Sequence, residues 1–358
     1  MKAFVFHDPG DIRVEDLPAP SLTDPFDVLL RPLCVGICFT DKHAYDGWLH
    51  PAFRRGAVFG HEGSATVIET GEGVTGLSPG DRVAILPTVG CGECLVCRAG
   101  LGNRCSSGTR WMPTMETEQF IAPERACFRI PDAVSDIAGA CIESLTCGLR
   151  AVRGSGIALA DNVVVLGGDD YAHAVVQAAR LAGAAQVVFA DPLRVRRDVA
   201  TRLGAIVLDP TDPDFVAHVR QLMPWGADHV FLSQENYMPA AVHYFRQACE
   251  VLRLQGTVNI LRAHSEDGLG RYPAFLPWSK EITVRHYGVF FGEEPARGGR
   301  PRGDFQVTID AVARGDLDGE AHVTHVAEFA DISEKKDLDA IYELLPEFEA
   351  KVMFRVSR

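Results

Sequence analysis

Four cysteines in one short run constrain this chain more than any other feature. Cys91, Cys94, Cys97 and Cys105 follow the spacing C-x2-C-x2-C-x7-C. Four thiolates can close a tetrahedral shell around one Zn²⁺, and a closed shell leaves no open position for chemistry. The run therefore predicts a structural metal site, which braces a loop and takes no part in catalysis.

A pair of disulfides is the alternative interpretation of the run. The first residues, Met1 to Phe6, lead at once into a polar turn, and no apolar leader or stretch of membrane-span length is present. Other cysteines stand singly in apolar surroundings, which is typical of buried thiols in a reducing compartment. We therefore expect zinc at the run and a cytoplasmic protein.

Length and charge narrow the class of protein further. A chain of 358 residues is too long for one core and long enough for two domains. Its formal net charge of −13 argues against a binder of nucleic acid or of an anionic membrane. A small-molecule substrate is the remaining expectation.

The first 150 residues alternate short β-type runs with glycine and proline turns. Residues 65–69, 82–86 and 127–130 are examples of such runs. This pattern predicts a small, mostly antiparallel barrel as the first domain, over residues 1–150.

The pattern changes after residue 150. Residues 162–166 form a continuous apolar run, as expected for a parallel strand buried on both faces. A helix over 171–182, a strand over 186–189 and a helix over 195–203 follow. Strands that alternate with helices predict an α/β fold with a doubly wound parallel sheet over 151–287. Residues 288–358 are expected to return to the first domain and to end in a closing strand near 351–356.

Two further motifs accompany the cysteine run. Gly60-His61-Glu62 is one, and Gly36-Ile37-Cys38-Phe39-Thr40-Asp41 is the other. Together, in this order, the three motifs resemble those of the zinc-containing medium-chain dehydrogenase/reductase family, which includes alcohol, polyol and threonine dehydrogenases. The resemblance covers nearly the whole chain. It implies a GroES-like catalytic domain, a Rossmann cofactor domain, two zinc ions per chain and a homodimer or homotetramer.

A catalytic zinc in this family needs three protein ligands and one open position. Cys38 and His61 supply a thiolate and an imidazole, both suited to zinc. The stretch around Glu143 resembles the "IEPL" of the polyol dehydrogenase branch, so Glu143 is the expected third ligand. Glu62 is its competitor, and Cys141 and Cys147 lie close enough in sequence to stay open.

Three residues near Cys38 are expected to serve the reaction. Asp41 is expected to bond the far nitrogen of His61, which fixes the tautomer of the ring. The resemblance implies that the Thr40 hydroxyl takes the substrate's proton and that His43 continues the relay. A local turn bond for Thr40 and a solvated ring for His43 are the alternatives.

The cofactor turn departs from the family's G-x-G-x-x-G. After the strand come Gly167 and Gly168, while Asp169 and Ala172 occupy the second and third glycine positions. The second glycine lets the backbone approach the pyrophosphate, and Asp169 puts a negative charge there. Asp170 adds a second charge at the helix start. Either carboxylate could cap the helix and compete with the phosphate.

Other positions near the cofactor give mixed signals. Phe39 replaces a glycine or an arginine, and Ser233-Gln234-Glu235-Asn236 replaces a smaller turn. Asp191, in contrast, ends the second strand 24 residues after Gly167, where an acidic residue bonds the adenosine ribose and favours NAD over NADP. We therefore expect NAD(H) in an altered site, with a plain helix cap as the alternative role for Asp191.

Three functions are consistent with this sequence. The first is a zinc- and NAD-dependent dehydrogenase of a secondary alcohol of polyol, cyclitol or amino-alcohol type. The second is a redox-neutral zinc lyase, isomerase or cyclase on the same scaffold, with an altered or lost nicotinamide site. The third, a non-catalytic binding protein, would explain Asp169 but not Cys38 and His61.

Overall fold

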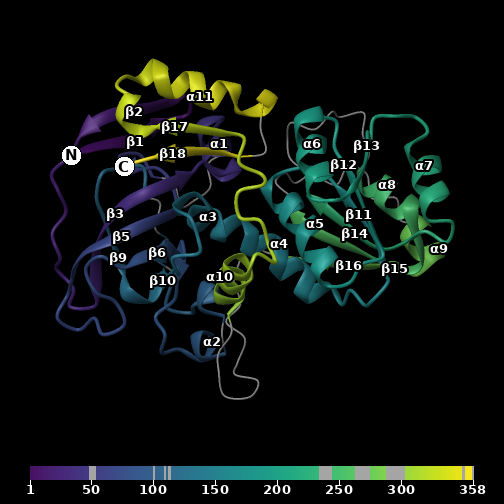
Figure 1. Cartoon of the computed structure of the whole chain (residues 1–358), viewed down its shortest axis with the longest axis horizontal. Coiled ribbons are helices and arrows are strands. Elements are labelled where there is room, and N and C mark those ends of the chain that lie inside the picture. The colour runs from purple at the N-terminus through teal and green to yellow at the C-terminus, as the bar shows by residue number, and fades with distance from the viewer. Residues whose placement is uncertain are drawn as a thin grey trace. The chain divides into compact units, whose positions relative to one another are not determined.

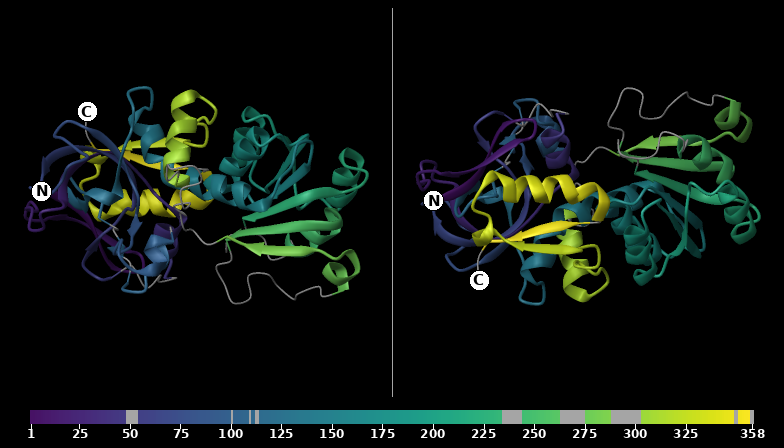
Figure 2. Two further views of the ribbon diagram at one scale, coloured as in Figure 1. Left: turned by 90° about the horizontal axis from the view of Figure 1, so that it is seen from below. Right: turned by 90° about the horizontal axis from the view of Figure 1, so that it is seen from above.

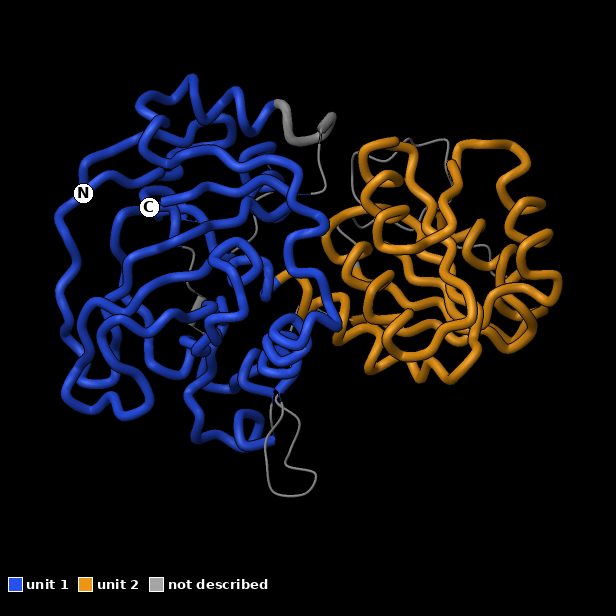
Figure 3. Tube along the Cα trace, in the orientation of Figure 1, with its two compact units in different colours: residues 1–143, 291–358 blue, residues 144–290 orange. Residues whose placement is uncertain are grey.

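The computed structural model describes residues 1–47, 54–99, 101–108, 110–111, 114–233, 244–262, 275–287, 303–348 and 351–356 (Figure 1). Its contacts divide the chain into two compact units (Figure 3). Unit 1 comprises Met1–Glu143 and Phe291–Arg358, and unit 2 comprises Ser144–Phe290. Because contacts do not measure independent folding, the domain limits expected from the sequence stay predictions.

Unit 1 is built on a seven-stranded sheet with the order β10-β6-β5-β3-β18-β17, in which β9 also pairs with β3. Its strands are β3 (Asp27–Gly36), β5 (Glu62–Thr70), β6 (Arg82–Ile85), β9 (Phe120–Pro123), β10 (Cys127–Arg129), β17 (His325–Glu328) and β18 (Val352–Arg355). All pairs are antiparallel except β17 with β18. The late strand β18 thus lies beside β3, as the expected return to the first unit requires.

Smaller elements complete unit 1. A three-stranded sheet has the order β2-β1-β4, and β7 pairs with β8. These strands are β1 (Lys2–Asp8), β2 (Asp11–Asp16), β4 (Ala57–Val58), β7 (Thr88–Val89) and β8 (Arg110–Trp111). The helices are α1 (Phe39–Tyr45), α2 (Leu95–Arg98), α3 (Asp136–Ala140), α10 (Asp304–Arg314) and α11 (Lys335–Phe348), with 3₁₀ turns η1 (Gly102–Arg104), η2 (Glu124–Ala126) and η3 (Phe329–Asp331).

An aromatic core joins the early and late parts of unit 1. Phe4 stacks on Phe329 with ring centroids 4.4 Å apart, and Tyr45 stacks on Tyr342 at 5.0 Å. Figure 2 shows α11, which carries Tyr342, lying along the strands of this unit. Burial of these large rings fixes α1, and Cys38, the first candidate ligand, stands immediately before this helix.

Unit 2 contains a six-stranded parallel sheet with the order β13-β12-β11-β14-β15-β16. Its strands are β11 (Asn162–Leu166), β12 (Gln186–Ala190), β13 (Ile206–Leu208), β14 (Ala227–Ser233), β15 (Leu252–Arg262) and β16 (Thr283–His286). The helices are α4 (Ile142–Ser155), which begins at the end of unit 1, α5 (Asp170–Leu181), α6 (Arg194–Arg202), α7 (Phe215–Leu222), α8 (Tyr244–Val251) and α9 (Phe275–Lys280).

Helices cover both faces of the parallel sheet. Val188 belongs to the same buried cluster as Phe215 of α7 and Tyr244 of α8. Its neighbour Phe189 stacks on His173 of α5, with ring centroids 5.0 Å apart. Because successive side chains of a strand point to opposite faces, α5 lies on one face and α7 and α8 on the other. The doubly wound parallel sheet predicted from the sequence is confirmed.

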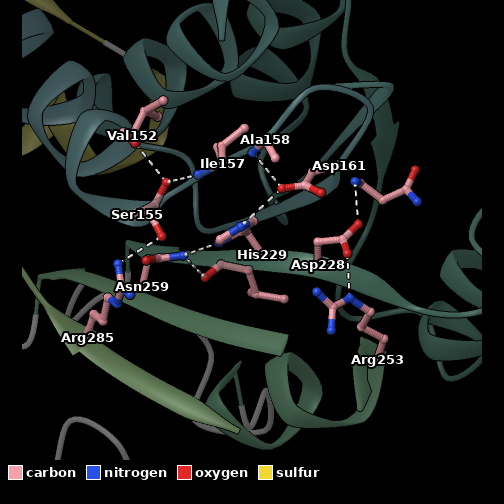
Figure 4. Close-up of polar contacts among 12 residues, drawn as sticks. Val152, Ser155, Ile157, Ala158, Asp161, Asp228, His229, Arg253, Asn259 and Arg285 are labelled. Carbon is pink, nitrogen blue, oxygen red and sulfur yellow. Dashed lines mark hydrogen bonds and ion pairs between the residues drawn. The ribbon is translucent and has the colours of Figure 1, made fainter. Parts of the chain in front are cut away.

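A polar network around the buried side chains of His229 and Asn259 lies at the start of the parallel strands of unit 2 (Figure 4). His229 Nε2 lies 3.4 Å from Asp161 Oδ2, and His229 Nδ1 lies 3.5 Å from Asn259 Nδ2. The Asn259 amide also accepts a bond from the Tyr287 hydroxyl at 3.3 Å. Asp161 in turn accepts the backbone N–H of Ala158 at 2.7 Å. The network ties β14 to β15 and to the loop before β11.

Candidate active site

The motif residues Cys38, His61 and Glu62 meet inside unit 1. Their ligand atoms all lie within 4.8 Å of one another, and all three side chains are buried. Cys38 stands immediately before α1, and Glu62 is the first residue of β5. Gly60, with φ of +81°, turns the chain just before His61, and a β-carbon there would lie 2.7 Å from Glu116 Cγ. A glycine is therefore needed at this position for both conformation and space.

Asp41 links the start of α1 to the imidazole of His61. One carboxylate oxygen accepts the Cys38 backbone N–H at 2.9 Å and completes a capping box. The other oxygen lies 3.2 Å from His61 Nδ1. The far ring atom, Nε2, lies 3.4 Å from the Thr40 hydroxyl. The ring thus presents Nε2 to the side where Cys38 and Thr40 stand.

Electrostatics around His61 favour a cation. Burial opposes a charged ring, but Asp41 and the Cys38 thiol outweigh this and raise the pKa of His61 well above its usual value in the metal-free protein. Either a proton or a metal ion satisfies the same negative surroundings. A thiolate, an imidazole and a carboxylate together form a donor set that suits zinc.

Glu62 forms a buried ion pair that sequence reasoning missed. Its Oε2 accepts a bond from the Lys351 ammonium, and the two side chains are 0% and 1% exposed. Its Oε1 is buried and accepts no hydrogen bond among the described residues. Glu62 and Lys351 are separated by 289 positions, so no local pattern could have indicated the pair. One carboxylate oxygen is therefore held by Lys351 while the other is left for a further partner.

The structure does not bring the other expected ligands into this group. Glu143 is 2% exposed and stands in the first turn of α4, and it is not among the three residues whose ligand atoms meet. Cys141 is buried in unit 1 but likewise lies outside the group, and Cys147 is buried and belongs to unit 2. His43 is buried on α1 rather than solvated, at 5% exposure.

The four cysteines of the run form a second group. Their Sγ atoms all lie within 4.8 Å of one another, with Cys91 and Cys97 at 3.9 Å and Cys94 and Cys105 also at 3.9 Å. A disulfide needs about 2.05 Å, and all four cysteines are free. Hydrogen bonds from Ser106 and from the Cys97 N–H lower the pKa of Cys94 to about 5. The arrangement is that of a closed four-thiolate metal site.

The turn after β11 is occupied by the chain's own carboxylate. Gly167 has φ of +89°, as such a turn requires, but Asp169 is the N-cap of α5 and is fully buried. Its Oδ1 accepts the Ala172 N–H at 2.9 Å and the Ser233 hydroxyl at 2.8 Å. Helix α5 consequently begins at Asp170, one residue before the predicted start. Gln234 to Asn236 lie outside the described residues.

Asp191 is buried against the same turn. A β-carbon at Gly168 would lie 2.6 Å from Asp191 Oδ2, so only glycine fits there. Asp191 accepts the Leu193 N–H at 2.7 Å and pairs with Arg196 at 3.5 Å. Burial raises the pKa of Asp191, and Arg196 opposes the rise. Arg196 is a second partner that the sequence reasoning did not find, although an arginine five positions on was visible.

Sequence comparisons place these features in a known family. A profile described as "Alcohol dehydrogenase GroES-like domain" matches residues 24–132, and one described as "Zinc-binding dehydrogenase" matches residues 172–314. A probable D-xylulose reductase A from Aspergillus clavatus is 30% identical over 91% of this chain and 90% of its own length. The chain belongs to the zinc-containing medium-chain dehydrogenase/reductase family. The family predicted from the sequence is thereby confirmed.

Solved structures of this family share the fold. A putative zinc-binding dehydrogenase from Sinorhizobium meliloti, bound to NADP, is 26% identical with a TM-score of 0.81 over 99% of both chains. The 2R,3R-butanediol dehydrogenase of Bacillus subtilis is 25% identical with a TM-score of 0.81, also over 99% of both chains. The predicted fold class, a GroES-like unit with a Rossmann unit, is confirmed.

Family membership also decides the class of protein. The chain is an alcohol dehydrogenase-like oxidoreductase of this zinc-dependent family, as the sequence predicted. The named relatives are dehydrogenases and reductases, so the redox-neutral alternative is not favoured. No described helix is both long and apolar enough to cross a membrane.

This family implies a catalytic zinc ion and a nicotinamide dinucleotide, and the residues of this chain fit the zinc better than the dinucleotide. The donor set of Cys38, His61 and Glu62, with the open Oε1 of Glu62, fits a zinc ion. The turn at Asp169 does not fit a pyrophosphate, because a carboxylate already holds the N–H of Ala172 at the start of α5.

Proposed function

We propose that this chain oxidises and reduces a secondary alcohol of polyol, cyclitol or amino-alcohol type at a zinc held by Cys38, His61 and a carboxylate, with NAD(H) as redox partner. The observation that carries the proposal is the buried meeting of Cys38, His61 and Glu62 within 4.8 Å. Glu62 is our first choice for the carboxylate because its Oε1 is buried without a hydrogen bond. Glu143, the ligand expected from the sequence, becomes the second choice.

Zinc bound at these residues would supply a Lewis acid that lowers the pKa of a substrate hydroxyl. The residues around it have separate tasks. The Asp41 carboxylate, 3.2 Å from Nδ1, holds the His61 ring in the tautomer whose Nε2 is unprotonated and can bind metal. Thr40 stands beside Nε2 at 3.4 Å and is only half-buried, so its hydroxyl can accept the substrate proton. His43, one helical turn on, is proposed to continue the relay.

The choice of substrate and of NAD(H) has indirect support. One relative is named as a reductase of D-xylulose, a ketose, and another as a dehydrogenase of 2R,3R-butanediol, a diol. Asp191 at the end of β12 favours NAD, since a carboxylate there repels a 2′-phosphate. The Sinorhizobium meliloti relative carries NADP, so NAD is a proposal specific to this chain. Gly167, Gly168, Asp169 and Ala172 form the turn proposed to face the cofactor.

The remaining proposals concern stability and assembly. Cys91, Cys94, Cys97 and Cys105 are proposed to hold a second, structural zinc, which gives two ions per chain. We also propose a cytoplasmic homodimer or homotetramer.

The test combines metal content with turnover. Purified protein should contain two zinc ions per chain and should form NADH from NAD and a polyol. Cys38→Ser should lose one zinc and nearly all turnover. Cys34→Ser is the matched control, because Cys34 is an equally buried thiol of unit 1 on β3 that belongs to neither cysteine-containing group. Two zinc ions retained in Cys38→Ser would contradict the proposal.

A further inference from the structure

The amide groups that begin α5 are already engaged inside the protein. The helix is 12 residues long, and its first turn would ordinarily present free N–H groups to an anion. Here the Ala172 N–H donates to Asp169 Oδ1 at 2.9 Å. The Tyr171 N–H donates to Asp170 Oδ1 at 3.0 Å. The start of the helix therefore carries its own anions.

Asp169 is held from a second element as well. Its Oδ1 accepts the Ser233 hydroxyl at 2.8 Å, and Ser233 ends β14, the strand that pairs with β11. Both side chains are 0% exposed. The carboxylate is thus fixed between the turn after β11 and the end of β14, which is where a parallel sheet of this kind binds its ligand.

We propose that Asp169 acts as an internal anion that occupies the pyrophosphate position of the free protein and must be displaced before a dinucleotide binds. This inference rests on the proposed NAD(H)-dependent function. Two negative groups at one helix terminus repel each other, and a repulsion of about 1.4 kcal/mol corresponds to a tenfold loss of affinity. Asp169 therefore weakens dinucleotide binding, and Ser233 strengthens that effect by holding the carboxylate in place.

The proposal has a chemical signature. The penalty falls on the phosphates of a ligand and not on its adenosine. Adenosine should bind alike with or without Asp169, whereas ADP-ribose and NADH should bind more tightly once the carboxylate is gone. A general loss or gain of structure would change the binding of adenosine and ADP-ribose together.

Calorimetric titration of the zinc-loaded protein tests this with ADP-ribose and adenosine as probes. Asp169→Ser keeps a hydroxyl that can cap α5 while it removes the charge and opens space. It should bind ADP-ribose roughly tenfold or more tightly than the wild type, with adenosine affinity unchanged. Asp169→Asn, which keeps both size and cap, should show a smaller gain. Ser233→Ala, which frees the carboxylate but keeps its charge, should show the smallest gain.

Asp198→Asn is the matched control for net charge. Asp198 lies on α6 in the same unit, is 57% exposed and pairs only loosely with Arg194 at 3.6 Å. The ADP-ribose affinity of Asp198→Asn should equal that of the wild type.

Two results would overturn the inference. One is equal or weaker ADP-ribose binding by Asp169→Ser, and the other is no ADP-ribose binding by any variant. If the wild type matches Asp169→Ser and still makes NADH from a polyol, the proposed function stands without the inference. If Asp169→Ser gains ADP-ribose affinity but no polyol is oxidised, the inference stands and the proposed function fails.

Discussion

Asp41 in unit 1 and Asp169 in unit 2 are both fully buried aspartates that cap a helix, yet they act on their sites in opposite ways. Asp41 divides its oxygens: one caps α1 and the other reaches His61 Nδ1. Asp169 uses a single oxygen, Oδ1, for both the Ala172 N–H and the Ser233 hydroxyl. The first arrangement prepares a neighbouring group for a ligand, and the second closes the helix terminus where a ligand would bind.

The difference shows that the functional role of a capping carboxylate depends on its second hydrogen-bond partner, which is an imidazole for Asp41 and a hydroxyl for Asp169. The partner of Asp41 is an imidazole, and an imidazole becomes a better metal ligand when the ring nitrogen that does not bind the metal faces a carboxylate. A hydroxyl as partner only holds the carboxylate in place. Residue type is the same in both cases, although Asp169 is the N-cap of α5 and Asp41 is the third residue of α1, so residue type alone cannot decide the role.

The largest expected effect comes from removing the group that Asp41 serves. His61→Ala should lower turnover by about 100-fold or more, because the Lewis acid is worth several kcal/mol of transition-state stabilisation. Zinc should fall from two ions to one per chain, with the remaining ion at the four cysteines. Steady-state kinetics and metal analysis on the same preparation check this. Unchanged zinc content would show that His61 is not a zinc ligand.

A variant of Lys351 tests whether the Glu62 carboxylate also serves the metal. Lys351→Met leaves a buried carboxylate without its partner, which costs about 3–5 kcal/mol of stability. Zinc at Glu62 would compensate part of that charge, so the loss should be smaller in the zinc-loaded protein than after chelation. Urea unfolding with and without metal measures both. Equal losses in the two states would argue for Glu143 as the ligand.

Asp41→Asn directly tests the different roles of Asp41 and Asp169, because the same substitution can be made at both positions. Asparagine still caps α1, but it no longer holds a negative charge against Nδ1 of His61. Zinc affinity should fall by about 10- to 100-fold, as for other partners of metal-bound histidines. Competition with a chelator gives the affinity. The matching change Asp169→Asn should leave zinc affinity unaltered, and any shared effect would mean that the two carboxylates are not functionally distinct.

The cap at Asp169 predicts a smaller effect on stability. Asp169→Ala should destabilise unit 2 by about 1 kcal/mol, since the Ala172 N–H loses its acceptor. Asp169→Asn should stay within a few tenths of a kcal/mol of the wild type. Denaturant unfolding followed by circular dichroism compares the two. A loss as large for asparagine as for alanine would show that charge, rather than capping, holds the turn.

His229 gives the smallest effect and a contrast to His61. Burial lowers the pKa of His229 below 6.5, although Asp161 and Asp228 oppose the shift. Because the folded protein prefers the neutral ring, this stabilisation is complete above the ordinary pKa and is lost as pH falls below it. The thermal midpoint of the wild type should therefore drop toward acid more than that of His229→Gln. Parallel pH profiles for the two proteins would contradict this.

Much of this protein is readable from its sequence because the signals are local. The cysteine run and the apolar strand at 162–166 depend on residues close together in the sequence, and the alternation of such strands with helices indicates the parallel sheet. The partners of Glu62 and Asp169 do not. Lys351 and Ser233 lie 289 and 64 positions away from them, so only the fold brings each pair together. The resemblance to the "IEPL" stretch favoured Glu143 as the third ligand over Glu62, whereas the structure groups Glu62 with Cys38 and His61.

Unit 1 is discontinuous, and this has a consequence for the order in which the protein is made. During synthesis Cys38, His61 and Glu62 leave the ribosome long before Lys351, and the whole of unit 2 is translated between them. Chains fold as they emerge, with earlier segments first. Until Lys351 and β18 are made, Glu62 lacks its countercharge and β3 lacks one of its three partner strands. The candidate zinc ligands of a nascent chain are thus synthesised before the lysine that neutralises one of them.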